Sequence, residues 1–151
     1  MEVFNCINFI LTNTQNAVCS YFKRRLQEFD ITPSQYNLLR CLWKQEAQTP
    51  SQLAHELHLD TSTITGILGR LEKKDLIERI YNQEDRRSVY IRLREEGIVL
   101  WEQIDKVIDE ANVEMLRGMS PEEAETLRMQ LRRIEANAKA QLEQDADSAD
   151  V

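Results

Sequence analysis

The sequence predicts a mainly α-helical protein built on a winged helix-turn-helix, with a small β-hairpin as the wing and long helices at both ends. Two short helices are expected over about 50–57 and 61–74, joined by a tight corner. Two β-prone runs follow, 77–81 and 88–93, separated by a polar loop. Long amphipathic segments flank this unit, over about 5–28, 95–117 and 121–142.

Three of the helix starts are predicted by one repeated pattern, which contains all three prolines of the chain. It occurs as Thr32-Pro33-Ser34-Gln35, Thr49-Pro50-Ser51-Gln52 and Ser120-Pro121-Glu122-Glu123. Each copy places a hydroxyl at the N-cap, proline at the first helical position and Gln or Glu at the third. The pattern therefore predicts helices that begin at 33, 50 and 121.

The long helices carry apolar residues at three- and four-residue steps, as amphipathic helices do. In the first helix these are Phe4, Ile7, Leu11, Val18, Phe22, Leu26 and Phe29. The last helix follows a near-heptad order, and a second helix over about 33–46 is expected to bury Tyr36, Leu39, Leu42 and Trp43. The long stripes either pack within one chain or form an intertwined dimer. We expect a homodimer, because palindromic DNA sites suit two-fold symmetric proteins.

Four segments follow from this pattern. We expect an N-terminal dimerisation helix over 1–32, a winged helix-turn-helix DNA-binding region over 33–94 and C-terminal dimerisation helices over 95–144. Residues 145–151 are expected to form a disordered acidic tail.

The charge distribution is compatible with a nucleic-acid partner although the whole chain carries −7. Residues 33–94 hold 10 basic and 8 acidic groups, whereas residues 95–151 hold 6 basic and 15 acidic groups. The acidity is therefore concentrated away from the predicted DNA-reading unit, and local potential governs binding more than net charge. No apolar run approaches the ~20 residues that span a bilayer, and the start lacks signal-peptide features. We expect a cytoplasmic protein with no membrane contact.

The helix over 61–74 is the candidate recognition helix. Ser62, Thr63 and Thr65 are expected to face outward near its start, where hydroxyls reach base edges and phosphates. Gly66 would allow close approach to DNA or, equally, to another helix. Arg70 would meet a phosphate or pair with Glu72 or Asp75. The alternative is that the hydroxyls serve only as caps and surface groups.

The loop between the two β-prone runs carries Asp85-Arg86-Arg87. Two arginines on a protruding turn gain free energy from counterion release on DNA, and a narrow minor groove attracts an inserted arginine. Asp85 is expected to hold a neighbouring guanidinium in one geometry. The alternative is a solvated turn with a weak surface ion pair.

The sequence gives little support for an enzyme, a cofactor or a metal site. Its four glycines are scattered, and Cys6, Cys19 and Cys41 have no metal-site spacing. We expect buried thiols to be the common case, with Cys6 as the best candidate for a reactive thiol.

The phrase S-T-I-T-G-I-L-G-R-L-E-K-K-D-L-I-E-R…D-R-R-S…I-R-L-R-E-E-G, together with the flanking long helices, closely resembles the MarR (multiple antibiotic resistance regulator) family. The resemblance covers about residues 5 to 142. It implies a homodimeric transcription regulator, usually a repressor, on a pseudo-palindromic operator in double-stranded DNA. It places Ser62, Thr63 and Thr65 on the recognition helix, and it implies that Asp85 braces Arg87 for the minor groove while Arg86 meets the backbone.

The resemblance also implies a small-molecule inducer, often phenolic or aromatic, bound between the dimer helices and the DNA-reading unit. Asn16, Tyr36, Leu39 and Trp43 are the candidate ligand-binding residues. A peroxide-sensing branch of the family uses a cysteine of the N-terminal helix, for which Cys6 or Cys19 is the counterpart. His58 stands near a turn where the family often has glycine, and histidine tolerates the left-handed region better than most residues.

The sequence thus predicts a homodimeric, sequence-specific DNA-binding transcription regulator, released by a ligand or by thiol oxidation. The alternative is a winged-helix protein-interaction module without specific DNA binding. Replacing Arg86 and Arg87 with alanine discriminates the two, since only the first loses its partner.

Overall fold

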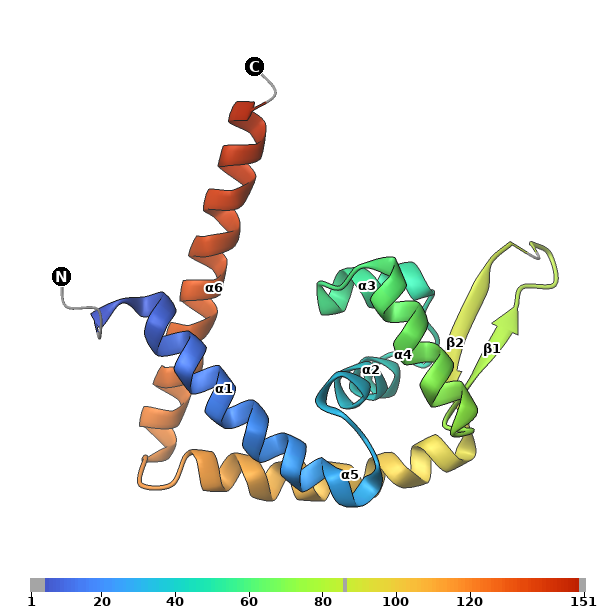
Figure 1. Ribbon diagram of the computed structural model, residues 1–151, viewed down its shortest axis with the longest axis horizontal. Coiled ribbons are helices and arrows are strands. Elements are labelled where there is room, and N and C mark those ends of the chain that lie inside the picture. The colour runs from blue at the N-terminus through green and yellow to red at the C-terminus, as the bar shows by residue number, and fades with distance from the viewer. Residues whose placement is uncertain (1–4, 86, 150–151) are drawn as a thin grey trace. The chain divides into compact units, whose positions relative to one another are not determined.

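A computed structural model describes residues 5–85 and 87–149, with side chains described as far as residue 145. Five helices of a first unit accompany one β-hairpin, and a further helix follows (Figure 1). In chain order the elements are α1 (Ile7–Leu26), a 3₁₀ turn η2 (Gln27–Phe29), α2 (Pro33–Lys44), α3 (Pro50–Leu57), α4 (Thr61–Lys73), β1 (Ile77–Tyr81), β2 (Val89–Leu93), α5 (Glu95–Met115) and α6 (Pro121–Ala149). The predicted winged helix-turn-helix is confirmed.

All three predicted capping patterns start helices. Thr32 and Thr49 accept hydrogen bonds from the N–H groups of Gln35 and Gln52, and both glutamine side chains accept one in return. Ser120 makes the same reciprocal pair with Glu123. Because these bonds satisfy backbone N–H groups that have no partner inside the helix, the starts at 33, 50 and 121 agree with the prediction.

The corner between α3 and α4 is built by His58 and Asp60. His58 ends α3 in the left-handed region, with φ 53°, and its N–H bonds back to Ala54 and His55. Asp60 caps α4, where its carboxylate accepts from the Thr63 N–H. A left-handed residue followed at once by an N-cap reverses the chain within a few residues. This corner fixes how α4 projects from the unit.

The wing pairs β1 with β2 in antiparallel register, from Ile77 opposite Leu93 to Tyr81 opposite Val89. A third segment joins it: Gln48 and Ile91 exchange backbone hydrogen bonds of 3.0 and 2.7 Å. The Gln48 side chain is buried and donates to the carbonyl oxygen of Cys41 near the end of α2. The wing is thereby attached to α2 through the middle of β2.

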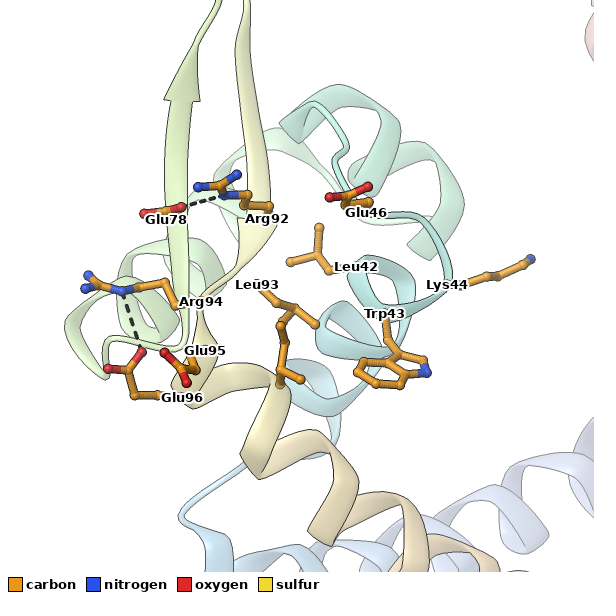
Figure 2. Close-up of a pocket in the computed structure, with 11 residues that line it drawn as sticks. Leu42, Trp43, Lys44, Glu46, Glu78, Arg92, Leu93, Arg94, Glu95 and Glu96 are labelled. Carbon is orange, nitrogen blue, oxygen red and sulfur yellow. Dashed lines mark hydrogen bonds and ion pairs between the residues drawn. The ribbon is translucent and has the colours of Figure 1, made fainter.

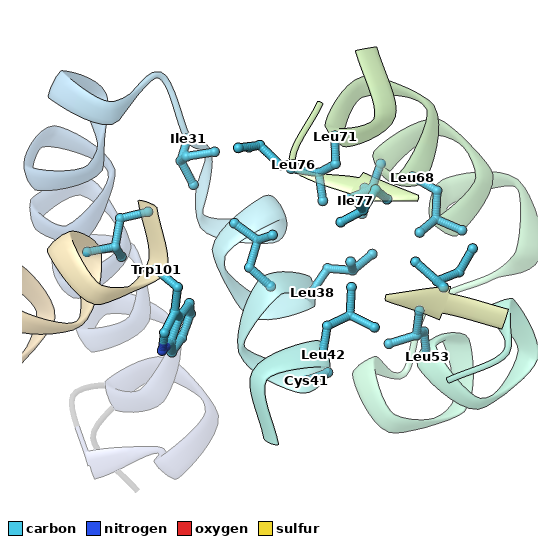
Figure 3. Packing of buried hydrophobic residues seen from close by; sticks show 14 of the residues in the cluster. Ile31, Leu38, Cys41, Leu42, Leu53, Leu68, Leu71, Leu76, Ile77 and Trp101 are labelled. Atoms are coloured by element: carbon cyan, nitrogen blue, oxygen red, sulfur yellow. The ribbon is translucent and has the colours of Figure 1, made fainter. Parts of the chain in front are cut away.

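The core of the first unit lies between α2, α3, α4 and the hairpin (Figure 3). Leucines and isoleucines fill it, with Leu38, Leu39, Leu53, Leu71 and Ile91 fully buried. Burying a side chain of this size contributes roughly 1.5–3 kcal/mol before the cost of ordering the chain. Trp101 of α5 packs on the other side of α2 (Figure 3).

The chain forms two compact units, the first ending at Ala111 and the second beginning at Asn112, so that α5 contributes to both. The end of the N-terminal helix contributes to the core of the first unit, because Leu26 is fully buried there. Its stripe near the start, by contrast, is exposed at Ile7 and Ile10.

The predicted end of the last helix is corrected by the structure. Helix α6 continues beyond Leu142 to Ala149, so residues 145–149 of the expected disordered tail are helical. The reason is local: the segment from 143 to 149 contains no glycine or proline to end a helix. Residues 150 and 151 of that predicted tail lie outside the described residues.

A close backbone approach sets the start of α5. The N–H of Arg94 donates to the carbonyl oxygen of Leu76, and Gly97 packs directly on that carbonyl. A Cβ at position 97 would overlap the oxygen. Glycine is therefore required at this crossing of α5 with the start of the wing.

Candidate nucleic-acid interface

The predicted DNA-reading residues of α4 share one exposed face. Ser62, Thr63, Thr65, Gly66 and Arg70 are all exposed, whereas Ile64, Ile67, Leu68 and Leu71 turn into the core. Helical periodicity produces this division, since positions three and four apart lie on one side. The hydroxyl face is therefore free for a partner.

Asp60 organises the start of this face. Its Oδ1 accepts from the Thr63 N–H at 2.7 Å and from the Ser62 hydroxyl at 2.8 Å. Hydrogen bonds from the Thr63 backbone and the Ser62 side chain hold the pKa of Asp60 below its usual value. Since the Ser62 proton is donated to Asp60, the exposed hydroxyl oxygen retains lone pairs that can accept a hydrogen bond.

Gly66 and Arg70 mark the middle of the face. A Cβ at Gly66 would meet nothing within 4 Å, so this glycine packs against no other helix of the described chain. Arg70 does not pair with the two predicted carboxylates. Glu72 is held by Arg79 at 3.1 Å and Asp75 by Arg94 at 3.2 Å.

Two residues missed by the sequence reasoning join this face. Thr32 and Ser34, at the start of α2, line a hollow of about 540 Å³ together with Ser62, Thr63, Gly66 and Arg70. The capping pattern did mark a helix start at Thr32. Its proximity to α4 depends on the packing of α2 against α4, which no local pattern reveals.

The wing loop is ordered by hydrogen bonds to the carboxylate of Asp85. Its Oδ1 accepts from the backbone N–H of Arg87 at 3.0 Å, and its Oδ2 accepts from the Ser88 hydroxyl at 3.0 Å. Asp85 thus supports the backbone that carries Arg87 rather than the guanidinium. The Arg87 side chain is exposed. Arg86 lies outside the described residues.

The predicted ligand-binding residues are brought together only in part. Tyr36 and Trp43 both stack on Trp101, with ring centroids 5.5 and 6.0 Å from that of Trp101. Trp43, expected to be buried, is 47% exposed, because it lies at the end of α2 beyond the core. Leu39 is fully buried in the core, and Asn16 is exposed on α1. Burial raises the pKa of the Tyr36 hydroxyl.

The three cysteines occupy different environments. Cys41 is buried, and burial raises the pKa of its thiol to about 11. Cys6 is half-buried at the cap of α1, and Cys19 is exposed on the same helix. Within the described residues, no three His, Cys, Asp or Glu side chains are grouped to hold a metal ion. None of the helices in that part of the chain is both long and apolar enough to cross a membrane.

A hydroxyl-lined helix exposed beside a protruding hairpin defines the winged-helix class of DNA-binding proteins. Comparison with known proteins identifies the family. The model of the MarR family matches residues 31–89. The organic hydroperoxide resistance transcriptional regulator of Bacillus subtilis is 34% identical over 128 residues, which are 85% of this chain and 84% of that protein. The chain belongs to the MarR family, whose members are DNA-binding transcriptional regulators.

Solved structures agree with this assignment. A probable transcriptional regulator from Pseudomonas aeruginosa matches with a TM-score of 0.81 and 28% identity, covering 88% of this chain and 99% of that one. A mutant MarR from E. coli, complexed with operator DNA, matches with a TM-score of 0.80 and 25% identity over 89% and 99% of the two chains.

Proposed function

We propose that this protein is a homodimeric repressor that binds a pseudo-palindromic operator and releases it in response to a chemical signal. The observation that carries the proposal is the free face of α4. Exposed hydroxyls, a glycine with open space beside it and the exposed Arg70 lie there, and the hydroxyl hydrogen bonds of Ser62 and Thr65 are made only to Asp60 and Thr61 at the start of the same helix. Such a face suits the major groove, where short polar side chains reach base edges.

The wing supports the same conclusion. Asp85 shapes the loop from within, so that Arg87 is presented on a preformed turn. Preorganisation lowers the entropy lost when the arginine contacts a phosphate or a minor groove. The structure of a related MarR bound to operator DNA, which shares the fold over most of this chain, further supports DNA as the partner.

The homodimer is supported by exposed apolar side chains on the long helices. Those more than half exposed are Ile7 on α1, Val99 and Val113 on α5, and Met129 and Leu142 on α6. Apolar stripes that remain in water within one chain are usually covered by a partner. Light scattering of the purified protein should give twice the 17.7 kDa of one chain, and Met129→Glu should shift it toward the monomer.

The signal is a small aromatic molecule or an oxidant. The stacked Tyr36, Trp101 and Trp43 favour the first, since aromatic rings recognise flat ligands. For oxidation, Cys19 offers an exposed thiol, and the Bacillus subtilis relative is named for hydroperoxide resistance. The substitutions Cys6→Ser and Cys19→Ser test the second. If peroxide still releases DNA from the protein that carries both substitutions, these thiols are not the sensors.

The experiment that tests the function is fluorescence anisotropy with the protein's own upstream DNA and a scrambled duplex, across a salt series. We expect tight binding that strongly prefers the native duplex. Arg87→Ala removes one phosphate-binding charge and should reduce the slope of the logarithm of the DNA association constant against the logarithm of the salt concentration by about 1. Equal, weak binding to both duplexes would favour the protein-interaction module instead.

A further inference from the structure

The first unit contains an open cavity of about 720 Å³ that the DNA-reading face does not use. Its walls come from the end of α2, the two strands of the wing and the start of α5 (Figure 2). Its apolar surface is formed by Leu42, Trp43, Leu93 and Ile98. This volume is within the range of about 300–1,000 Å³ that holds a small organic molecule.

The basic residues around the cavity are already neutralised or directed away. Arg92 is paired with Glu78, while Arg94 lies 3.2 Å from Asp75 and 3.8 Å from Glu96. Lys44 extends away from the other lining side chains in Figure 2. An anionic ligand would therefore have to break existing ion pairs to find a partner.

Two carboxylates of the lining remain available. Within the part of the chain that the structure describes, Glu46 and Glu95 have neither an ion pair nor a side-chain hydrogen bond. They lie on opposite sides of the apolar surface in Figure 2, Glu46 after α2 and Glu95 at the start of α5. The uncompensated charge of the cavity is therefore negative.

Trp43 supplies a surface for a cation. Its indole is 47% exposed, yet it is held by stacking on the buried Trp101, with an interplanar angle of 25°. The face of an indole attracts a cation through the ring quadrupole, and a fixed ring loses little entropy on binding. An apolar surface, a fixed indole and free carboxylates together specify one kind of ligand.

We propose that this cavity binds an aromatic or otherwise lipophilic cation, and that this ligand is the chemical signal of the regulator. The second half of the proposal rests on the proposed function. The cavity is bounded by the base of the wing and by α5, so a ligand there contacts both the DNA-binding hairpin and a long helix of the expected dimer. Differential binding to one arrangement of these elements would shift the protein away from the DNA-bound form.

Isothermal titration calorimetry of the full chain tests the site with two probes of the same tetrahedral shape and opposite charge. Tetraphenylphosphonium should bind saturably, with one site per chain, and tetraphenylborate at least tenfold more weakly. The site is overturned if the borate binds as tightly as the phosphonium, or if the phosphonium shows no saturation.

Variants assign the binding to this cavity. Glu46→Gln combined with Glu95→Gln should weaken tetraphenylphosphonium binding by roughly tenfold, from a few-fold effect of each exposed carboxylate. Glu28→Gln removes one exposed carboxylate outside the cavity and should leave the affinity unchanged. Trp43→Leu, with its fold checked by thermal melting, should weaken binding roughly fivefold. Unchanged affinity in the glutamate double variant would overturn the assignment.

Anisotropy with the upstream duplex, with and without tetraphenylphosphonium, tests the role as signal. We expect the ligand to weaken DNA binding of the unsubstituted protein and not of the double variant. An unchanged DNA affinity at saturation overturns the signalling role. The site and the proposed function fail separately. Cation binding without any DNA binding contradicts the repressor and with it the signalling role, but leaves the site standing. DNA binding without cation binding contradicts only the site and its role.

Discussion

The carboxylate of Asp85 accepts a hydrogen bond from the backbone N–H of Arg87 at 3.0 Å, and thereby fixes the turn that presents this arginine. The second oxygen of the carboxylate binds the Ser88 hydroxyl. An acidic residue on a loop expected to face phosphates thus has a structural role that offsets its unfavourable charge. Both hydrogen bonds lie within the loop, so Asp85 acts on Arg87 through its backbone N–H.

This relationship predicts different DNA affinities for Asp85→Asn and Asp85→Ala. Both remove the same charge, but asparagine retains an oxygen that accepts from the Arg87 N–H. We expect the asparagine variant to bind the operator about fivefold more tightly than the alanine variant, as a single hydrogen bond contributes about 1 kcal/mol. Anisotropy at one fixed salt concentration measures the difference. Equal affinities would show that the turn forms without Asp85.

Asp60 contributes a negative charge that opposes DNA binding and an N-cap that stabilises α4, and two substitutions separate these contributions. Asp60→Asn keeps an N-cap acceptor and removes a negative charge at the start of α4, so DNA affinity should rise about two- to threefold at low salt and less at high salt. Asp60→Ala should lower the melting temperature through loss of the cap. Lower DNA affinity in the asparagine variant would contradict this assignment.

The pH dependence of the same residue follows from the direction of its shift. Because the folded-state pKa of Asp60 is lowered, its contribution to stability is present above the ordinary pKa of an aspartate and is lost as the pH falls through the folded value. The difference in melting temperature between the protein and Asp60→Ala should therefore shrink in acid.

Gly66 and Gly69 form a matched pair on α4, since neither has an atom within 4 Å of an added Cβ. Alanine at either position should stabilise the protein by up to about 1 kcal/mol through helix propensity. Only Gly66→Ala should weaken operator binding, by roughly tenfold or more, because Gly66 is on the exposed hydroxyl face. Chemical denaturation and anisotropy give the two readings. Unimpaired DNA binding by Gly66→Ala would show that DNA does not contact α4 closely at this position.

Gly97 predicts a large loss of stability. Alanine there would overlap the Leu76 carbonyl, which also accepts from the Arg94 N–H, so the backbone must shift. We expect Gly97→Ala to destabilise the protein by about 1–3 kcal/mol, as overpacking of a tight site does. Urea denaturation measures this, with Gly69→Ala as the control of opposite sign. A neutral effect would mean that α5 is free to move from the wing.

Cys41 predicts slow thiol chemistry. In a protein carrying Cys6→Ser and Cys19→Ser, iodoacetamide at pH 8 should modify Cys41 at least tenfold more slowly in the folded than in the urea-unfolded state, because the thiol is buried and its pKa is raised to about 11. Mass spectrometry follows the reaction. Equal rates would show that α2 opens readily.

The same raised pKa predicts that the free energy of unfolding falls at alkaline pH. The contribution of the Cys41 thiol is complete below its ordinary pKa of 9.0 and is lost as the pH rises toward about 11. Cys41→Ala should lose this part of the alkaline dependence.

Several local features were predictable because they depend on neighbours in the sequence. The three Pro-containing starts, the bounds of α3 and β1, and the exposed face of α4 follow from capping chemistry and periodicity. The acidic composition after Leu142 predicts fraying, but α6 continues to Ala149, because residues 143–149 contain no glycine or proline to end the helix. The prediction that Trp43 is buried was also wrong, because its side chain lies at the end of α2 beyond the core and is exposed.

The sequence by itself determined the winged helix-turn-helix, the exposed hydroxyl face of α4 and the presence of arginine in the wing loop, because each is encoded by residues within a few positions of one another. Only the tertiary structure decided that Arg79 and Arg94 engage the carboxylates expected for Arg70, that Thr32 and Ser34 join the α4 face, and that Trp101 holds Trp43 beside a cavity with two free carboxylates. These relationships join residues far apart in the chain. They arise from the packing of α2 against α4 and α5, which satisfies burial over the whole unit rather than at any one segment.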